Sequence, residues 1–539
     1  MRIGKSWLLV LSLLLALSAV LAGCGSSGDS GGSQGEKTLI YGRGADSKSL
    51  DPIQVTDGES LKVTKNIYDT LVDYDDDNTE VVPGLAERWE SSKDGKTWTF
   101  YLRKGVKFHD GTDFNAEAVV YNFERWMDKD HPDHKGGEFP YYGYMFGGYK
   151  GDKGHVIKSV TAVDEYTVKF ELNYPQAPFL NNLAMPPFGI ASPTAVKKDP
   201  EGFGQKPVGT GPFKLDSWKK NDTITLVKNE EYWQEGLPKL DKLIYRSIPE
   251  NAARFSALQA GDIDIMDGLN PSDVKLVKQN QNLQIFERPG MNVAYLAFNT
   301  EKKPFNDPKV RQALNHAVNK EGIIKSFYAD LAKPAKNPMP DVLWGYNDQI
   351  KDYEFDLDKA KKLLKEAGYA DGFKVDFWAP TDPRPYMPDG KKIAEFIQAD
   401  LAKIGVKAEI VSYDWQTYLD RTGKGEHSMA LLGWIGDNGD PDNFLYVLLD
   451  KDNAKGPDAG NIAFYKNDKL HDILIKAQQV TDQEERTKLY EQAQEIIKKD
   501  APWVPLVHVT EPMAAWNHVK GYIPHPTGSD KMLKVDIEK

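Results

Sequence analysis

The chain of 539 residues contains one cysteine, Cys24. A single cysteine excludes an internal disulfide and any Cys-based metal cluster. Histidine offers no clear substitute: His131 and His134 in "HPDH" could form a metal pair, but Pro132 opposes a continuous helix there and no third ligand is apparent. A surface loop is the favoured interpretation of this segment, and we expect neither a metal nor a cofactor.

An excess of basic residues is also missing. The chain has 68 Lys and Arg against 80 Asp and Glu, a formal net charge of -12. A nucleic-acid partner is therefore not expected, because phosphate binding requires a basic face. Hydrophobic content of 40% and 12 tryptophans indicate a folded protein, and the length predicts two or three folded units.

Motifs of hydrolytic enzymes are absent outside one short segment. "GDSGG" at Gly28 to Gly32 resembles the nucleophile segment of trypsin-like proteases, in which the triad histidine precedes the serine. The first histidine here is His109, so Ser30 is interpreted as part of a linker. Asp437 and Asp440 could serve as a carboxylate pair for glycoside chemistry, but without a nucleophile elbow or H-E-x-x-H motif we expect a protein that is not an enzyme.

The longest apolar stretch lies at the start of the chain and is too short for a membrane span. Trp7 to Val20 follows the basic residues Arg2 and Lys5, and "LAGC" ends at Cys24. A spanning helix requires ~20 apolar residues, so this segment is typical of a secretory signal peptide. "LAGC" resembles a bacterial lipobox, which implies a signal peptide over 1–23, lipidation of Cys24 and an extracytoplasmic protein anchored to the membrane. The alternative is a stray cysteine beside an ordinary signal.

The segment after Cys24 is rich in glycine and serine, and we expect 24–36 to be the lipidated cysteine and a flexible linker. Short β-rich runs then alternate with turn signals as far as Pro207, which indicates a mixed, hairpin-containing region. Beyond Phe298, helices and strands alternate. Asp307 and Pro308 predict a helix start, and Gly368 predicts a helix end. Such alternation predicts a sheet covered by helices, with ligand sites beyond the carboxyl ends of strands.

One loop in this second region combines glycines and carboxylates. "GWIGDNGDPDNF" (Gly433 to Phe444) follows an apolar strand. It could hold a metal, serve an active site, bind a cationic group or form a solvated bend. It lacks the glycine and glutamate spacing of an EF-hand, and Asp440 and Asp442 are interpreted as turn and capping residues. The tyrosine cluster from Tyr141 to Tyr149 could line a pocket or belong to an aromatic core.

Several segments resemble the family 5 extracytoplasmic solute-binding proteins of ABC importers. These segments occur in the family's order and are spread over nearly all of the mature chain: "AERWESSKDGKTWTFYLRKGVKFHDGTDFNAEAVVYNFER", "PVGTGPFKL", "ARFSALQAGDIDI" and "FNTEKKPFNDPKVRQALNHAVNK". Within the family, "RPYMPDGKKIAEFIQADLAKIGV" and "GWIGDNGDPDNF" are most similar to the dipeptide-binding members.

The resemblance implies an α/β fold with two hinged lobes, the periplasmic-binding-protein fold, and an additional mixed α/β domain inserted in the first lobe. The strand crossings between lobes are expected near Phe298 and Val509, with "WVPLVHV" returning to the first lobe. The expected division is lobe I from 37–70, 208–297 and 510–539, the inserted domain from 71–207, and lobe II from 298–509.

The same resemblance assigns a ligand site. It implies that Asp437 binds the ammonium group of a peptide and that Arg384 binds its carboxylate. Further ligand contacts are implied for Trp434, Gly436, Thr56 and Gly58. The chain departs from the family pattern at Asp57, Met387 and Asp389.

These residue types suit a zwitterionic ligand. Unpaired burial of either peptide terminus is costly, and the planar guanidinium of Arg384 can bond both carboxylate oxygens. The two resemblances, to the family and to a lipobox, together imply a monomeric, membrane-anchored lipoprotein that captures dipeptides or other short peptides and delivers them to an ABC transporter permease. The alternative is a receptor of the same fold for longer oligopeptides, glutathione, haem or a nickel complex.

Overall fold

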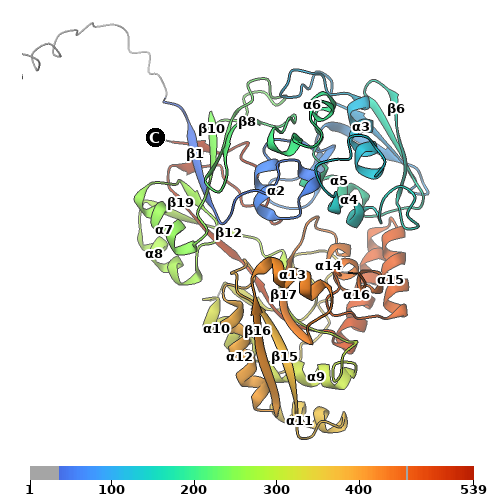
Figure 1. Ribbon diagram of the computed structural model, residues 1–539, viewed down its shortest axis with the longest axis vertical. Helices are drawn as coiled ribbons and strands as arrows, with labels where there is room; N and C mark the ends of the chain where they lie inside the picture. The colour runs from blue at the N-terminus through green and yellow to red at the C-terminus, as the bar shows by residue number, and fades with distance from the viewer. Residues whose placement is uncertain (1–34, 330, 457–458, 539) are drawn as a thin grey trace, which may run out of the picture. The chain divides into compact units, whose positions relative to one another are not determined.

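Two large β-sheets organise the chain from Lys37 onward (Figure 1). The computed structural model describes residues 35–329, 331–456 and 459–538. The expected signal peptide over 1–23 and the expected lipidation site at Cys24 lie outside the described residues. Within those ranges, every helix is too short or too polar to span a bilayer.

The first sheet has seven strands in the order β12-β19-β11-β1-β10-β9-β8. Its central strand β1 pairs in parallel with β10 and β11, and its Leu39 and Tyr41 are buried in one cluster with Tyr245 and Met513. The helices α7 and α8 pack against this sheet. The bounds are β1 Thr38–Arg43, β8 Phe213–Lys219, β9 Thr223–Lys228, β10 Lys242–Ser247, β11 Ile265–Met266, β12 Leu283–Arg288, β19 Glu511–Trp516, α7 Asn251–Ala260 and α8 Val274–Gln279.

The second sheet has six strands in the order β14-β18-β13-β17-β15-β16. Strands β13 and β18 are buried along their whole length because apolar clusters cover the sheet on both faces. The strand bounds are β13 Asn292–Phe298, β14 Ala332–Pro334, β15 Phe373–Pro380, β16 Val406–Tyr413, β17 Met429–Ile435 and β18 Trp503–Val509. The helices are α9 Pro308–Ala317, α10 Lys320–Phe327, α11 Leu357–Glu366, α12 Gly390–Ala402, α13 Trp415–Gly423, α14 Asp442–Leu449, α15 Asp468–Gln479 and α16 Gln483–Asp500.

Two short segments join the sheets. The chain leaves the first sheet after Arg288 and enters the second at Asn292, and it returns between Val509 and Glu511. The two segments touch, because a Cβ added to Gly290 would lie 2.7 Å from the carbonyl oxygen of Val509. The second sheet thus begins at Asn292, whereas the sequence placed the start of lobe II at 298. The strand Trp503–Val509, expected to return to the first lobe, pairs with β13 and β14 in the second sheet, and β19 makes the return.

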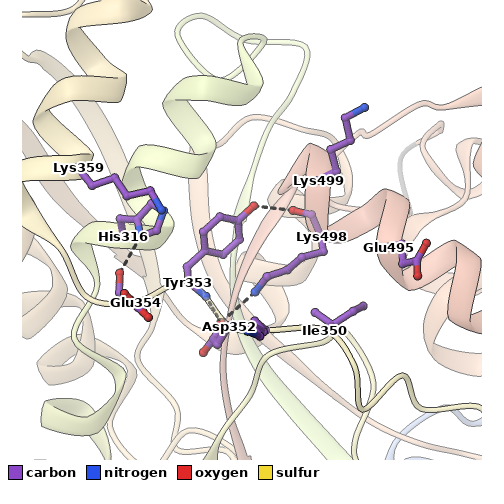
Figure 2. Close-up of a pocket in the computed structure, with 10 residues that line it drawn as sticks. His316, Ile350, Asp352, Tyr353, Glu354, Lys359, Glu495, Lys498 and Lys499 are labelled. Atoms are coloured by element: carbon purple, nitrogen blue, oxygen red, sulfur yellow. Dashed lines mark hydrogen bonds and ion pairs between the residues drawn. The ribbon is translucent and has the colours of Figure 1, made fainter.

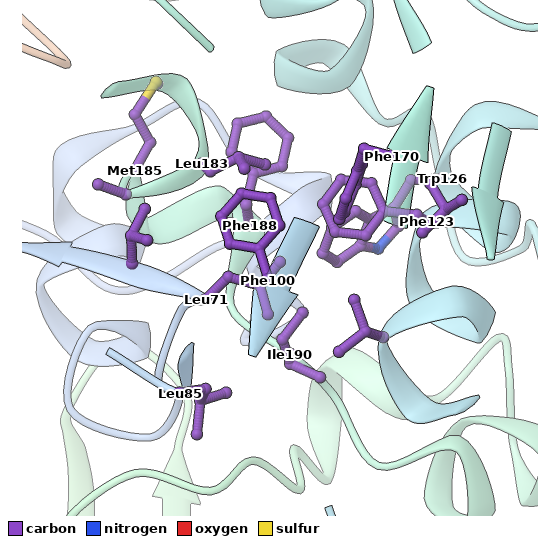
Figure 3. Close-up of a cluster of buried hydrophobic side chains, with 14 of the residues drawn as sticks. Leu71, Leu85, Phe100, Phe123, Trp126, Phe170, Leu183, Met185, Phe188 and Ile190 are labelled. Atoms are coloured by element: carbon purple, nitrogen blue, oxygen red, sulfur yellow. The ribbon is translucent and has the colours of Figure 1, made fainter. Parts of the chain in front are cut away.

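Most of the segment between β1 and β8 packs around an aromatic core of its own (Figure 3). Some of its residues, among them Leu50, Tyr68 and Phe203, join the core of the first sheet. The segment's four-stranded sheet has the order β4-β5-β7-β6, and Phe123 and Phe170 meet edge to face at 4.8 Å between ring centroids. The elements are α2 Gly58–Thr64, β2 Val72–Tyr74, β3 Val81–Pro83, β4 Ala86–Ser91, β5 Thr97–Leu102, α3 Ala116–Met127, α4 Pro140–Met145, β6 Ile157–Asp164, β7 Thr167–Leu172, α5 Phe179–Leu183 and α6 Pro193–Lys198. Two short strands, β20 Val519–Lys520 and β21 Asp536–Ile537, pair near the end of the chain.

Local sequence signals account for several element boundaries. The Asp307 side chain accepts a hydrogen bond from the Lys309 amide and Pro308 opens α9, as predicted. Gly368 follows α11 with φ +85°, which confirms the predicted stop. These boundaries could be read from sequence because each depends on residues within one helical turn.

Candidate functional site

The loop between β17 and α14, residues 436–441, carries Asp437 and Asp440 and is called the acidic loop below. It begins beside the first of the two segments that connect the sheets. Ile435 pairs with Asn292 in the ladder, and the amide of Gly436 donates to the carbonyl oxygen of Met291 at 2.8 Å. A Cβ at Gly436 would lie 2.7 Å from the ring of Phe444, so no larger residue fits without displacing that ring. The start of the acidic loop is therefore fixed to residues 289–291, which connect the first sheet to the second.

Asp437 is held by neutral donors only. Its Oδ1 accepts from the Tyr141 hydroxyl at 3.0 Å, and its Oδ2 accepts from the Asn443 amide at 3.1 Å. The Asn443 Oδ1 in turn accepts from the Asp437 backbone amide and from the Trp434 indole, both at 2.9 Å. Among the described residues, no lysine, arginine or histidine forms an ion pair with Asp437.

Burial raises the pKa of Asp437 to about 6, and the hydrogen bonds from Asn443 and Tyr141 oppose this rise. The residue as a whole keeps some solvent exposure, but its carboxyl group is enclosed enough for desolvation to dominate. Ionised at neutral pH, it is a buried anion that has no cationic partner within the part of the chain that the structure describes. Such a group is stabilised by a positively charged ligand.

Asp440 has the opposite environment. Both of its oxygens pair with the guanidinium of Arg486, at 2.8 and 2.9 Å, and the Tyr490 hydroxyl donates to it at 3.2 Å. It also accepts from the amide of Asp442 at 3.0 Å, which is the turn role expected from sequence. The bidentate ion pair with Arg486 was not expected, and it satisfies this carboxylate within the protein.

Asp442 is the first residue of α14 rather than its cap, since Pro441 occupies the N-cap position. Burial, reinforced by the charge of Asp440, raises the pKa of Asp442 to about 7. Its Oδ2 accepts from the Gln478 side chain at 3.1 Å. Within the described part of the chain, no side-chain hydrogen bond caps the start of α14, so the capping role expected for Asp442 is not formed, and its carboxyl bonds to Gln478 instead.

The acidic loop also contacts the segment inserted between β1 and β8. The Asn181 side chain donates to the carbonyl oxygen of Asn438 at 3.0 Å, and the Asn438 side chain donates to Asn182 at 2.8 Å. Gly439 has φ +69°, and a Cβ there would lie 1.9 Å from the Thr79 hydroxyl. Together with the hydrogen bond from Tyr141, these contacts attach the acidic loop to the segment between β1 and β8.

Thr56 and Gly58 lie at the start of α2 and are exposed. Between them, Asp57 caps this helix by accepting from the Ser60 amide at 2.9 Å, which explains the departure from the expected small polar residue. Burial, the carboxylate of Asp437 and, more weakly, that of Asp57 raise the pKa of the Tyr141 hydroxyl well above its usual value.

Arg384 lies in a tight turn after β15. Strands β15 and β17 are parallel neighbours, so the segments that follow them emerge at the same edge of the second sheet. The Arg384 and Met387 backbones exchange two hydrogen bonds of 2.9 Å. The guanidinium carbon lies 4.2 Å from the centroid of the Trp415 ring. Among the described residues Arg384 has no ion-pair partner, and its Nε is buried without a hydrogen-bond acceptor.

The Arg384 turn packs on the strand that leads to Asp437. A Cβ at Gly433 would lie 2.3 Å from the Tyr386 ring, so this glycine admits the ring of the residue two positions after Arg384. Burial raises the pKa of Tyr386, and the neighbouring charge of Arg384 opposes the rise. Met387 is buried in the core and Asp389 caps α12, so both departures from the family pattern have local structural roles.

Trp434 is partly buried against the apolar cluster of the second sheet, and its indole N–H orders Asn443. Sequence reasoning did not identify Tyr141 individually, and it missed Asn181, Asn443 and Arg486. The tyrosine cluster carried a signal, because a pocket lining was one of its two interpretations. In the structure Tyr141 and Tyr142 are buried, whereas Tyr144 is 57% exposed.

The histidine pair is engaged in local structure. The Asp133 amide donates to His131 at 3.1 Å, and His134 bonds to the carbonyl oxygen of Arg125 at 2.8 Å. Within the described ranges, Asp450, Asp452 and His471 have ligand atoms close enough to hold a metal ion. Asp450 caps a short helix and bonds to His471 at 3.0 Å, so these groups already satisfy one another.

Comparison with known proteins identifies the family. The model of the bacterial extracellular solute-binding proteins, family 5, matches residues 80–456. The chain is 40% identical to the dipeptide-binding protein of Escherichia coli (strain K12), over 100% of both chains. It is also 40% identical to heme-binding protein A of Haemophilus influenzae, over 97% of this chain and 98% of the relative.

A solved structure agrees with the sequence matches. The periplasmic binding protein DppA from Helicobacter pylori, in complex with the peptide STSA, superposes with a TM-score of 0.84 at 44% identity, over 93% of this chain and 98% of that chain. The expected α/β fold of two lobes with an inserted domain is confirmed by this likeness. The chain is a solute-binding protein and not an enzyme, and it belongs to the family 5 bacterial extracellular solute-binding proteins, as its sequence motifs indicated.

Proposed function

We propose that this protein captures short peptides by their two charged ends outside the bacterial membrane and delivers them to an ABC transporter permease. The observation that carries the proposal is the buried carboxyl of Asp437, which neutral donors orient and no protein cation neutralises. A peptide α-ammonium supplies the missing charge together with N–H donors of the right kind.

Arg384 is the counterpart for the other end of the ligand. It stacks on Trp415, has a buried Nε without an acceptor, and emerges from the same sheet edge as the acidic loop. A peptide carboxylate would accept from its planar fork. Trp434 and Gly436 shape the loop around Asp437, and we propose Thr56 and Gly58, at the exposed start of α2, as contacts from lobe I.

Pairing both ends would make the site sensitive to peptide length. One additional residue moves a terminus by ~3.3 Å, which separates either the ammonium from Asp437 or the carboxylate from Arg384. Losing one partner of a buried pair costs ~3 to 5 kcal/mol, or roughly 10² to 10³-fold or more in affinity. Side chains would contribute less, because main-chain bonds along a strand edge are independent of peptide sequence.

The remaining elements of the proposal concern the cell envelope and domain movement. We propose that the signal peptide 1–23 is removed, that Cys24 carries the lipid anchor, and that the monomeric protein extends from the membrane on the linker 24–36. Lobe I with its inserted domain would close on lobe II, whose sheet begins at Asn292 and ends at Val509. Differential affinity of the closed state for the peptide would drive closure.

A calorimetric titration of the soluble chain from Gly25 onward tests the function. The probes are dialanine, trialanine, tetraalanine and N-acetyl-dialanine. Tight binding of dialanine with at least ~10²-fold weaker binding of N-acetyl-dialanine is the expected result. Absence of affinity for every peptide in the folded protein would refute the proposal.

Longer peptides are the second candidate cargo, because the Helicobacter pylori relative was solved with the peptide STSA. Equal affinity for dialanine and tetraalanine would favour this reading, since one of the two terminal contacts would then be dispensable. Equal affinity for N-acetyl-dialanine would show that Asp437 does not anchor the peptide ammonium.

A further inference from the structure

A cavity away from the acidic loop lies on lobe II, between α9, the segment 350–354, α11 and α16 (Figure 2). Its volume is about 510 Å³, within the range of ~300 to 1,000 Å³ typical of small-molecule sites. None of its lining residues belongs to the acidic loop or to the Arg384 turn. Its lining residues are His316, Ile350, Lys351, Asp352, Tyr353, Glu354, Lys359, Glu495, Lys498 and Lys499.

Four lysines line this cavity, against the three carboxylates Asp352, Glu354 and Glu495. Asp352 pairs with two ammonium groups, Lys320 at 2.8 Å and Lys498 at 2.9 Å. One carboxylate thus serves two partly or fully enclosed lysines. Burial lowers the pKa of Lys320 to about 8 and also lowers the pKa of Lys498, while Asp352 opposes both shifts.

The rim adds further positive charge. Lys351, Lys359 and Lys499 are exposed, and among the described residues none of them forms an ion pair. In Figure 2, Lys359 lies beside His316, and Lys498 reaches toward Asp352 next to Tyr353. With Lys320, five lysines gather here against three carboxylates, in a chain whose net charge is -12. The repulsion among these ammonium groups would be relieved by a bound anion.

The cavity wall is rigid and aromatic. The His316 ring meets the Tyr353 ring edge to face at 5.0 Å, and the Lys498 ammonium lies 4.1 Å from the centroid of the Tyr353 ring. The Tyr353 hydroxyl donates to the carbonyl oxygen of Lys498 at 2.6 Å, and His316 bonds to that of Glu354 at 2.7 Å. These bonds hold the wall in place before any ligand arrives.

From this geometry we infer that the cavity binds a small phosphate-bearing ligand. The lining contains lysines and no arginine. Ammonium groups act as compact point charges that suit a tetrahedral phosphate, whereas a planar carboxylate is better matched by arginine. The volume exceeds that of inorganic phosphate alone, so the phosphate would carry a small organic group such as a glycerol unit, supplied by a soluble metabolite or by a phospholipid head group.

The test uses the soluble chain from Gly25 onward, which contains the whole compact unit Lys37–Lys539. Glycerol 3-phosphate is titrated by calorimetry, with glycerol as the uncharged control. For the lipid source, co-sedimentation is measured with vesicles of phosphatidylcholine alone and of phosphatidylcholine with phosphatidylglycerol.

The pocket variant is Lys359→Gln with Lys499→Gln. The matched control is Lys362→Gln with Lys488→Gln, which removes the same charge from exposed positions of the same helices, α11 and α16, outside the cavity. We expect the pocket variant to weaken binding of glycerol 3-phosphate, or of the anionic vesicles, by about fivefold or more. The control variant should change it by less than about twofold.

The outcomes separate the sources and the alternatives. Binding of glycerol 3-phosphate supports a soluble ligand, and binding of anionic vesicles alone supports a lipid head group. Binding of neither probe, equal binding of glycerol, or an equal loss in the control variant would overturn the inference. Dialanine affinity should be the same in all variants, so failure of the proposed peptide function would be recognised separately.

Discussion

Asp437 and Asp440 lie three positions apart in one loop, and both are enclosed by protein, yet their partners differ in charge. Asp440 is neutralised by the bidentate guanidinium of Arg486 at 2.8 and 2.9 Å. Asp437 receives hydrogen bonds from a phenol and an amide. The same residue type thus stabilises the fold at one end of the loop and leaves a negative charge available at the other.

The comparison teaches how a structural carboxylate can be distinguished from a binding one. A buried charge that is already paired in the protein gains nothing from a charged ligand, and losing its partner destabilises the fold. A buried charge that has only neutral donors costs stability in the free protein and recovers it when a counterion binds. The two aspartates should therefore respond oppositely to the same substitution.

The largest expected effect is on stability, from Asp440→Asn. The substitution leaves the buried Arg486 without its counter charge, and we expect the free energy of unfolding to fall by ~3 to 5 kcal/mol. Denaturant unfolding measures this change. Asp437→Asn is the matched control, and it should leave the stability of the ligand-free protein unchanged or raised. Equal destabilisation by both substitutions would contradict the distinction between the two residues.

The next effect concerns the positive end of the site. Arg384→Gln should lower dialanine affinity by about 10²-fold, because the peptide carboxylate would lose its charged partner. Arg384→Lys should restore only part of that loss, since an ammonium cannot bond both oxygens in one plane. Calorimetry measures both variants.

Arg421 offers a matched control for Arg384. It also stacks on an aromatic ring, with its guanidinium carbon 4.4 Å from the centroid of Tyr413, but it pairs with Glu426. Arg421→Gln should leave dialanine affinity nearly unchanged. A loss as large as that of Arg384→Gln would indicate that stacking on the sheet edge, and not carboxylate recognition, is responsible.

A third effect is on pH dependence. The pKa of Asp437 in the ligand-free protein is about 6, so protonation below that pH removes the charge that would bind an ammonium. Dialanine affinity should fall as the pH is lowered from 7 to 5, approaching about tenfold per unit below the pKa. Asp437→Asn should abolish most of this slope, and a wild-type slope retained in that variant would assign the titration to another group.

The stability of the ligand-free protein should change in the opposite direction. A carboxyl whose folded pKa is raised by burial contributes fully below its unfolded pKa of ~3.9, and this contribution is lost as the pH rises through about 6. Asp442, with a pKa of about 7, contributes with the same sign. Thermal unfolding of wild type and Asp437→Asn between these pH values separates the two contributions.

The smallest effect is expected from Tyr141→Phe. This change removes one neutral hydrogen bond to Asp437 and should weaken dialanine binding by about two- to tenfold, consistent with a net ~0.5 to 1.5 kcal/mol. Tyr142→Phe is the neighbouring control, because that hydroxyl bonds to His155 instead. If Tyr142→Phe weakens binding as much as Tyr141→Phe, the effect comes from general loosening of α4.

Sequence reasoning identified the elements of the second sheet well because their signals are local. The cap at Asp307, the stop at Gly368 and the strand that begins directly after Gly405 each depend on a few neighbouring residues. The placement of β18 depended on which strands it pairs with across the chain. Its sequence is apolar apart from His508 and is compatible with either sheet.

Most of the residues that bond to the acidic loop could not be predicted from sequence either, because they lie far from it along the chain. Tyr141 lies 296 positions from Asp437, and Arg486 lies 46 positions from Asp440. No periodicity or motif links residues at such separations, so sequence alone could place the aspartates on a loop beyond a strand but could not tell which of them was already neutralised.

The most direct test of the distinction is a cycle of two changes measured by calorimetry. Dialanine and N-acetyl-dialanine are titrated into wild type and into Asp437→Asn. If Asp437 pairs with the peptide ammonium, acetylation should cost roughly 10²-fold or more in wild type and little or nothing in the variant. If acetylation lowers the affinity by the same factor in both proteins, the peptide ammonium is bound elsewhere and Asp437 is not its partner.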